Sequence, residues 1–160
     1  MQIHENNSPA DPGAIEALER ELRTELPEQY RTFLAQYNGG YPEPDGFSFY
    51  NRYPKNHFES NTNVSKAILD RFLGLYDGEY DNLKKYLEVY KGRIPANMIP
   101  VAHDPGGNLI CLALTGDDAG KIFYWKHDEE VEENETPDYR NIYFVAQSFD
   151  EFLSSLVDFS

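Results

Sequence analysis

Four short apolar segments follow one another between residues 98 and 147, and they constrain the fold more than any other feature of the sequence. They read MIPVAH (98–103), NLICLAL (108–114), KIFYWKH (121–127) and NIYFVAQ (141–147), and turn-forming residues separate them. Short runs of β-branched, aliphatic and aromatic residues between turns are typical of strands. Strands joined by short turns pair antiparallel. The sequence therefore predicts an antiparallel meander in this half of the chain.

Apolar residues at helical spacing predict three helices before the meander and one after it. The first covers 15–22, the second begins at Pro27 and stops before a Gly-Gly pair, and the third covers 81–91. The last helix begins at Ser148, because Ser148 and Glu151 form an S-x-x-E capping box. Its predicted buried stripe consists of Phe149, Phe152, Leu153, Leu156 and Val157.

The remaining segments carry weaker patterns. Residues 41–63 are rich in Pro, Gly, Asn and Tyr, which predicts a loop with one short strand at 47–50. Segment 67–75 fits either a strand or a short helix. Helices first, then strands, then a closing helix argue for an α+β fold, in which an antiparallel-rich sheet meander carries N-terminal, middle and C-terminal helices. We expect one domain over 1–160, with a polar lead-in at 1–13.

Charge limits the partners of this chain. It has 14 Lys and Arg against 28 Asp and Glu, a formal net charge of −14 at pH 7. Such a field repels nucleic acid and anionic membranes, and it accelerates encounter with cationic proteins. The sequence shows no signal-peptide pattern and no apolar run near the roughly 18 residues of a membrane span. With a single cysteine, the sequence predicts a cytoplasmic protein that binds neither nucleic acid nor membrane.

Two glycine-containing segments resemble phosphate-binding loops but are better explained as turns. DPGGN (104–108) supplies the Pro, Gly and Asn that turns require, and a strand rather than a helix follows it. TGDDAGKI (115–122) has one residue too few between its glycines for a P-loop. Ile122 also stands where a P-loop has Ser or Thr. No cofactor is therefore predicted.

The distribution of reactive side chains supports neither a metal site nor catalysis. The four histidines are dispersed, and one cysteine cannot build a thiolate cluster. Cys111, His103 and Asp104 could supply a nucleophile, a base and an acid, which leaves an enzyme as an alternative hypothesis. Cys111 lies within L-I-C-L-A-L, however, where a free cysteine usually behaves as a small buried hydrophobe. We therefore expect a protein that is not an enzyme, with no catalytic residue and no metal.

The segment HDEEVEENETPD (127–138) contains seven carboxylates and no Lys or Arg. A run of this kind is usually a solvated loop. The alternative is a docking surface for a cationic partner, which would explain why the chain carries a run of acids that repel one another. Both interpretations stay open from these residues alone.

Four segments together resemble the SUKH superfamily of Smi/Knr-type, cell-wall-assembly-regulator-like proteins. They are LPEQYRTFLAQYNGG (26–40), IPVAHDPGGNLICLAL (99–114), GKIFYWKHD (120–128) and SFDEFLSSLV (148–157), and the resemblance spans roughly 15–157. The matching positions are Leu26, Pro27, Tyr30, Phe33, Leu34, Asn38, Gly39, Gly40, Asp104, Gly107, Asn108, Gly120, Trp125, His127 and Asp128. Pro105 and the long acidic insert after Asp128 depart from the pattern, so the identity of the partner cannot be inherited from the family.

The resemblance implies an α+β domain without known catalytic activity. Bacterial members resemble immunity proteins that neutralise a cognate toxin, often a nuclease, and fungal members are regulatory interaction proteins. We therefore expect a cytoplasmic antitoxin that occludes the active cleft of a basic nuclease-type toxin. The alternative is a regulatory module that recruits an endogenous partner. The predicted partner-binding residues are of two kinds. Aromatic anchors are expected at Tyr41, Phe47 and Tyr50. Acids that steer the partner are expected at Asp128, Glu129, Glu130, Glu132 and Glu133, with Asp104, Asp117 and Asp118 on neighbouring turns.

Overall fold

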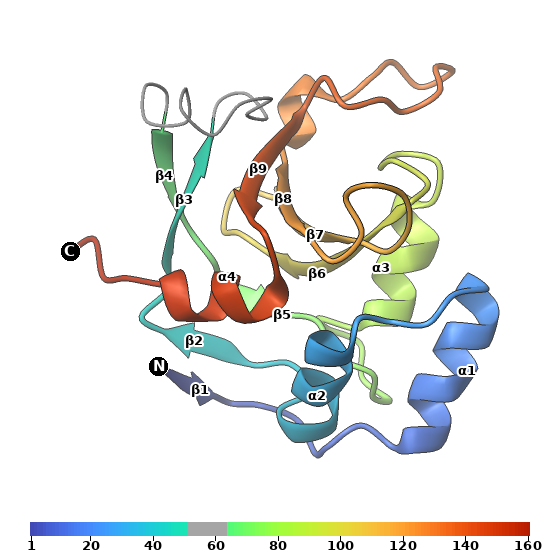
Figure 1. Ribbon diagram of the computed structural model, residues 1–160, viewed down its shortest axis with the longest axis vertical. Coiled ribbons are helices and arrows are strands. Elements are labelled where there is room, and N and C mark those ends of the chain that lie inside the picture. The colour runs from blue at the N-terminus through green and yellow to red at the C-terminus, as the bar shows by residue number, and fades with distance from the viewer. Residues whose placement is uncertain (51–63) are drawn as a thin grey trace.

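The computed structural model describes residues 1–50 and 64–160, and these form four α-helices, one 3-10 helix and nine strands in antiparallel sheets (Figure 1). The α+β prediction is therefore confirmed. In chain order the elements are β1 (Gln2–His4), α1 (Pro12–Leu22), α2 (Glu28–Gln36), β2 (Tyr41–Glu43), β3 (Gly46–Tyr50), β4 (Val64–Ile68), β5 (Arg71–Phe72), α3 (Leu83–Tyr90), β6 (Met98–His103), β7 (Leu109–Ala113), β8 (Ile122–Trp125), η2 (His127–Glu129), β9 (Ile142–Ala146) and α4 (Phe149–Ser155).

The predicted meander forms the central sheet. Its strand order is β5-β6-β7-β8-β9, and every neighbouring pair is antiparallel. The register of β6 on β7 shifts between Pro100 and Ala102. Proline has no N–H to donate to a ladder, so a bulge beside it lets the pairing resume one residue later. All four predicted strands are thus present, and β5 extends the sheet at one edge.

Both faces of this sheet are buried, which explains why its strands are apolar along their whole length rather than alternating. On β7, Ile110 and Leu112 face one apolar cluster, while Leu109, Cys111 and Ala113 face another. Helices α2 and α4 cover the first face, because Tyr30, Phe33, Phe149 and Phe152 belong to its cluster (Figure 1). Tyr86 and Tyr90 of α3 pack against the second.

The predicted helices are all present, and their ends follow the expected capping chemistry. The Ser148 hydroxyl accepts a hydrogen bond from the Glu151 N–H at 3.1 Å, as the capping box requires. The Asp11 carboxylate caps α1 by accepting from the Gly13 N–H at 2.9 Å. Helix α2 ends at Gln36, two residues before the predicted stop, because Asn38 already adopts a positive φ of 53° before Gly39 does at 113°.

Three details of the predicted organisation need correction. The polar lead-in contains a strand, since β1 pairs with β2. The predicted loop at 41–63 contains β2 as well as β3, and its part from 51 to 63 lies outside the described residues. Val157 belongs to no buried helical stripe: it lies beyond α4, is 44% exposed, and pairs with Gly46 as an isolated bridge. The segment 67–75 forms the end of β4 and the two-residue β5 rather than a helix.

Candidate partner-binding surface

Asp104 locks the β6–β7 turn from inside the protein. The residue is buried, with 7% of its surface exposed. Its Oδ1 accepts from the N–H groups of Gly106 (2.9 Å) and Asn108 (2.8 Å), and its Oδ2 accepts from Asn108 Nδ2 (3.0 Å) and the Tyr124 hydroxyl. Burial, together with this hydrogen bond and the charge of Asp104, raises the pKa of Tyr124. Because all these donors belong to the protein, Asp104 is a structural residue and not the exposed steering charge that the sequence suggested.

The same network fixes where the acidic segment leaves the sheet. The His127 N–H donates to Asn108 Oδ1 at 3.0 Å, and His127 Nε2 lies 2.9 Å from the Gly106 carbonyl oxygen. Gly107, which the turn requires at a φ of 89°, lies against the His127 ring. The β6–β7 turn and His127, the second residue after β8, are therefore held together at one end of the sheet.

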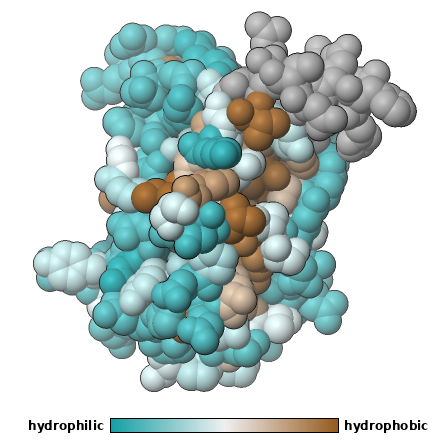
Figure 2. All heavy atoms as spheres, turned by 90° about the vertical axis from the view of Figure 1, so that its left-hand side faces the viewer, coloured by the Kyte–Doolittle hydropathy of each residue, from teal (hydrophilic) through white to brown (hydrophobic). Residues whose placement is uncertain are grey.

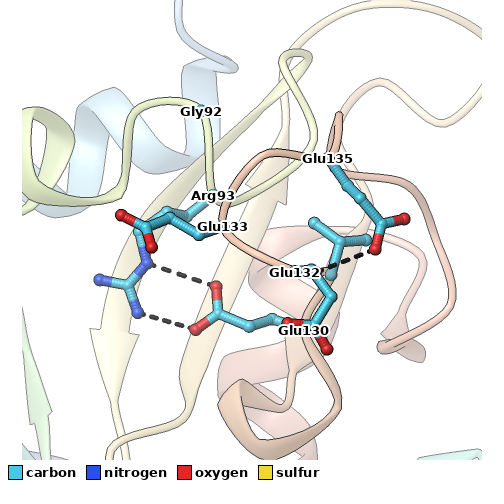
Figure 3. Close-up of a pocket in the computed structure, with 7 residues that line it drawn as sticks. Gly92, Arg93, Glu130, Glu132, Glu133 and Glu135 are labelled. Carbon is cyan, nitrogen blue, oxygen red and sulfur yellow. Dashed lines mark hydrogen bonds and ion pairs between the residues drawn. The ribbon is translucent and has the colours of Figure 1, made fainter.

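The acidic loop, defined as residues 127–138, is anchored first by a partly buried ion pair between Arg93 and Glu130. Arg93 Nε and Arg93 NH2 lie 3.3 Å and 3.0 Å from the two carboxylate oxygens of Glu130 (Figure 3). The Arg93 guanidinium also lies over the rings of Tyr90 (4.6 Å) and Trp125 (5.8 Å). A bidentate, stacked arginine holds a carboxylate in a defined position. Glu130 is thus neutralised by the protein's own arginine and serves to attach the loop.

Glu129 is the second attachment. Its carboxylate accepts from the Tyr143 hydroxyl at 2.6 Å and lies 3.3 Å from Lys126 Nζ. Burial, and then the hydrogen bond to Glu129, raise the pKa of Tyr143 to about 12, with a smaller contribution from the charge of Asp128. Glu129 and Glu130 were predicted to bind a partner, but their carboxylates are already engaged within the protein.

The remaining predicted acids of the loop point into solvent. Asp128, Glu132 and Glu133 are exposed, and among the described residues none of their carboxylates has a hydrogen bond or ion pair. Glu132 and Glu133 line a cavity of about 360 Å³ together with Gly92, Arg93, Glu130, Val131 and Glu135 (Figure 3). Glu135 closes the loop on itself by accepting from the Glu132 N–H at 3.3 Å. The arrangement presents uncompensated carboxylates around a concave surface on an anchored loop.

Asp117 and Asp118 lie in the β7–β8 turn and do not join this surface directly. Asp118 precedes β8 and Asp128 follows it, so the two are separated by about the length of that strand, roughly 13 Å for four residues. Asp118 also forms an ion pair with Lys121 at 3.1 Å. The expectation that all the acidic turns are neighbours therefore holds for the turn at 104–108 and not for this one.

The predicted aromatic anchors are used in internal packing and are not brought together. Phe47 is fully buried, with its ring 5.3 Å from that of Tyr124, so its prediction as a surface anchor is wrong. Tyr50 is half-buried and stacks on Phe144 at 5.6 Å. Tyr41 is half-buried on another strand, where its ring stacks on His4 at 5.1 Å.

The residues of the enzyme alternative do not form a reactive group. Cys111 is fully buried, and burial raises the pKa of its thiol. His103 Nε2 contacts Asp81 Oδ1 at 2.6 Å, while the Asp104 carboxylate is engaged in the turn. Cys111 belongs to the cluster on one face of the sheet, so its thiol has no route to a substrate in solvent. In residues 1–50 and 64–160, no group of three or more His, Cys, Asp or Glu could hold a metal ion, and no helix is long and apolar enough to cross a membrane.

Sequence reasoning missed Arg93, although it decides which acids of the loop stay uncompensated. It lies 37 residues before Glu130, and no local pattern links the two. The sequence did contain one signal: Arg93 follows Gly92, which ends the predicted helix at 81–91, so Arg93 could be placed in the turn after that helix. The identity of its carboxylate partner could not.

Two comparisons with known proteins give matches over most of the chain. The family model described as SMI1 / KNR4 family (SUKH-1) matches residues 9–155 of this chain. The chain is also similar to the SPbeta prophage-derived uncharacterized protein YokK of Bacillus subtilis (strain 168). The two are 33% identical over 150 residues, which cover 90% of this chain and 73% of that protein.

Proposed function

The chain belongs to the SMI1 / KNR4 family (SUKH-1), and we propose that it is a non-catalytic, cytoplasmic immunity protein that binds and neutralises a basic, nuclease-type toxin. The family is consistent with this class of function. The observation that supports the choice of partner is the anchored acidic loop, on which Asp128, Glu132 and Glu133 remain uncompensated beside a cavity.

The charge of the loop fits a cationic partner better than a neutral one. Its seven carboxylates face three nearby cations, Lys126, Arg93 and Arg140, which leaves four negative charges on this part of the surface. Clefts that bind phosphate are lined with Lys and Arg, so an inhibitor with this field is drawn toward them. Electrostatic steering of this kind accelerates association by roughly 10- to 1,000-fold at low salt.

Anchoring matters because a fixed carboxylate loses less conformational freedom on binding than one on a mobile loop. Arg93 holds Glu130, and Tyr143 holds Glu129. Further along the loop, the Glu135 carboxylate accepts a hydrogen bond from the Glu132 N–H and so fixes this stretch. The loop therefore offers preorganised charge. In the proposed complex it covers the toxin's cleft and excludes the nucleic acid by occupying the same cationic residues.

The test is to co-purify the chain with the basic toxin domain encoded next to its gene and to measure association and dissociation rates between 50 and 500 mM salt. We expect a complex whose association rate falls with salt. The Glu132→Gln/Glu133→Gln variant should associate roughly 3- to 10-fold more slowly at low salt. The matched control Glu16→Gln/Glu25→Gln removes the same charge from exposed positions elsewhere and should have a smaller effect.

Two results would contradict this proposal. If the neighbouring gene product forms no complex, or if the complex leaves its nuclease activity intact, the chain is not its immunity protein. If both double variants slow association equally, net charge alone is responsible and the acidic loop is not the docking surface.

A further inference from the structure

Within residues 1–50 and 64–160, strand β4 is paired along one edge only, and the geometry of its other edge follows from its register on β3. The strands pair antiparallel as Phe47 with Ala67 and Ser48 with Lys66, and the Leu69 N–H donates to the Asp45 carbonyl oxygen at 2.9 Å. Hydrogen-bonded pairs alternate with non-bonded pairs in an antiparallel ladder, so Ala67 and Ser65 direct their backbone groups toward β3. The backbone groups of Val64, Lys66 and Ile68 therefore point to the other side.

In the part of the chain that the structure describes, no strand pairs with that side of β4. The opposite edge of β3 is occupied, because the Gly46 N–H and carbonyl oxygen bond to Val157 at 2.7 and 2.9 Å. In the described part of the chain, the sheet of β3 and β4 thus ends in a row of backbone donors and acceptors that face no partner strand. Such a row is complementary to the backbone of one more extended strand.

The side chains along this edge are apolar and exposed. Val64 is 45% exposed and Ile68 is 46% exposed, and both lie on the outer face of the sheet. Val157 and Phe159 of the C-terminal segment, 44% and 38% exposed, continue the same face across Gly46. Figure 2, which views the molecule from this side, shows apolar residues gathered over β4 and the C-terminal segment. Four of the eight exposed large hydrophobic residues in the described part of the chain lie here.

A cation stands in the middle of this apolar row. Lys66 is exposed between Val64 and Ile68, and its Nζ lies 4.8 Å from the centre of the Phe159 ring. Among the described residues, no carboxylate forms an ion pair with it. A strand laid against β4 therefore meets the pattern apolar, cationic, apolar at alternate positions. Its best complement is apolar, acidic, apolar.

A second copy of the chain is a poor occupant. Each copy carries a net charge of −14, so two copies repel one another. If two β4 strands paired about the centre of the strand, Lys66 would also face Lys66 of the other copy, and like charges directly opposite each other destabilise a strand pair.

We propose that β4 is a strand-addition site, at which an extended segment of another protein pairs with Val64, Lys66 and Ile68 and places an acidic side chain opposite Lys66. The site is separate from the acidic loop and does not rest on the proposed immunity function. It gives the chain a second docking surface, specific for an extended apolar segment with a central carboxylate.

The test uses two capped seven-residue peptides of the sequence Thr-Val-Thr-X-Thr-Val-Thr, where X is the central residue. The central residue is glutamate in the probe and lysine in its control. Binding to the full chain is followed by nuclear magnetic resonance, with amide exchange measured at each residue. We expect the amides of Lys66 and Ile68 to become protected. We also expect the glutamate peptide to bind about fivefold more tightly than the lysine peptide, because glutamate forms an opposite-charge pair with Lys66 and lysine forms a like-charge pair.

Two variants separate backbone pairing from charge. Lys66→Pro removes the outward N–H at a position where an edge strand tolerates proline, and it should abolish binding of both peptides. Lys66→Ala keeps the N–H, so it should bind both peptides equally. Trp125 fluorescence reports whether each variant is folded. If Lys66→Pro is unfolded, Lys66→Ala still tests whether the charge of Lys66 distinguishes the two peptides.

Three outcomes would overturn the proposal. The first is the absence of amide protection along β4 with the glutamate peptide. The second is unchanged discrimination between the peptides in Lys66→Ala. The third is a dimer of the chain alone in analytical ultracentrifugation that Lys66→Pro converts to monomer, because the occupant of the edge would then be a second copy.

Discussion

Substitution of Asp104 by alanine provides the sharpest test of how this structure is held together. The sequence suggested that Asp104 is a surface charge, whereas the structure makes it the acceptor of four hydrogen bonds inside the β6–β7 turn. The two interpretations differ in what the variant loses. A steering charge affects association with a partner, whereas a turn lock affects the free energy of unfolding.

The expected cost follows from the four donors. The N–H groups of Gly106 and Asn108 lie in an exposed turn and can bond to water after the substitution, so each bond contributes about 0.5–1 kcal/mol. The Tyr124 hydroxyl is buried and loses a charged acceptor, and the Asn108 side-chain amide loses the same acceptor. The loss of these two hydrogen bonds together costs about 1.5–3 kcal/mol. The total is about 4 kcal/mol. For a chain of this length, that lowers Tm by roughly 8–16 °C.

Urea unfolding provides the assay, because Trp125 is the single tryptophan and is fully buried. The variant Tyr124→Phe should cost about 1.5 kcal/mol in the native background and close to nothing in the Asp104→Ala background. Asp117→Ala, which removes an exposed acid from another turn, is the matched control and should cost less than about 0.5 kcal/mol. A loss below about 1 kcal/mol for Asp104→Ala, with the same cost of Tyr124→Phe in both backgrounds, would refute the lock.

Three further predictions concern other parts of the molecule. A Cβ at position 46 would lie 2.5 Å from the Val157 carbonyl oxygen, so Gly46→Ala should displace the C-terminal segment and expose its amides to exchange, whereas Ser48→Ala should not. Cys111 should react with Ellman's reagent only when the protein unfolds; stoichiometric reaction of the native protein would revive the enzyme hypothesis. Arg93→Ala should speed amide exchange throughout the acidic loop without changing the exchange of β7, and uniform acceleration would show that Arg93 supports the whole fold.

The strands of the central sheet could be predicted because both of their faces are buried, so that each strand is a continuous apolar run. The pattern failed where a strand is short or half-polar. Strand β2 has three residues, one of them Pro42, and β4 reads V-S-K-A-I, whose polar residues hid the alternation. Phe47 was placed at the surface because the segment around it, 41–63, is mostly irregular, although 47–50 was predicted as a strand. In G-F-S-F-Y, however, Phe47 and Phe49 share one face of a strand, and that spacing indicated burial.

Side-chain roles were harder to predict than elements, because they depend on register. The D-P-G-G-N segment indicated a turn, and an Asp at its start commonly accepts from the N–H two residues later, as Asp104 does from Gly106. The second half of the lock lies on Tyr124, which reaches Asp104 only through the pairing of β7 with β8. The same holds for Glu130, whose neutralisation by Arg93 depends on how α3 ends beside the loop.

Some of the residues on which the resemblance to the family rests also hold one end of the central sheet together. Asp104, Asn108 and His127 are matching positions, and all three act in one hydrogen-bond network that fixes the end of β8 against the β6–β7 turn. The acidic insert starts directly after that network and is held beyond it by Arg93. A loop attached to so rigid a point can change in length and charge without disturbing the sheet. Under the proposed function, the acidic loop rather than the residues of this network selects the cationic partner.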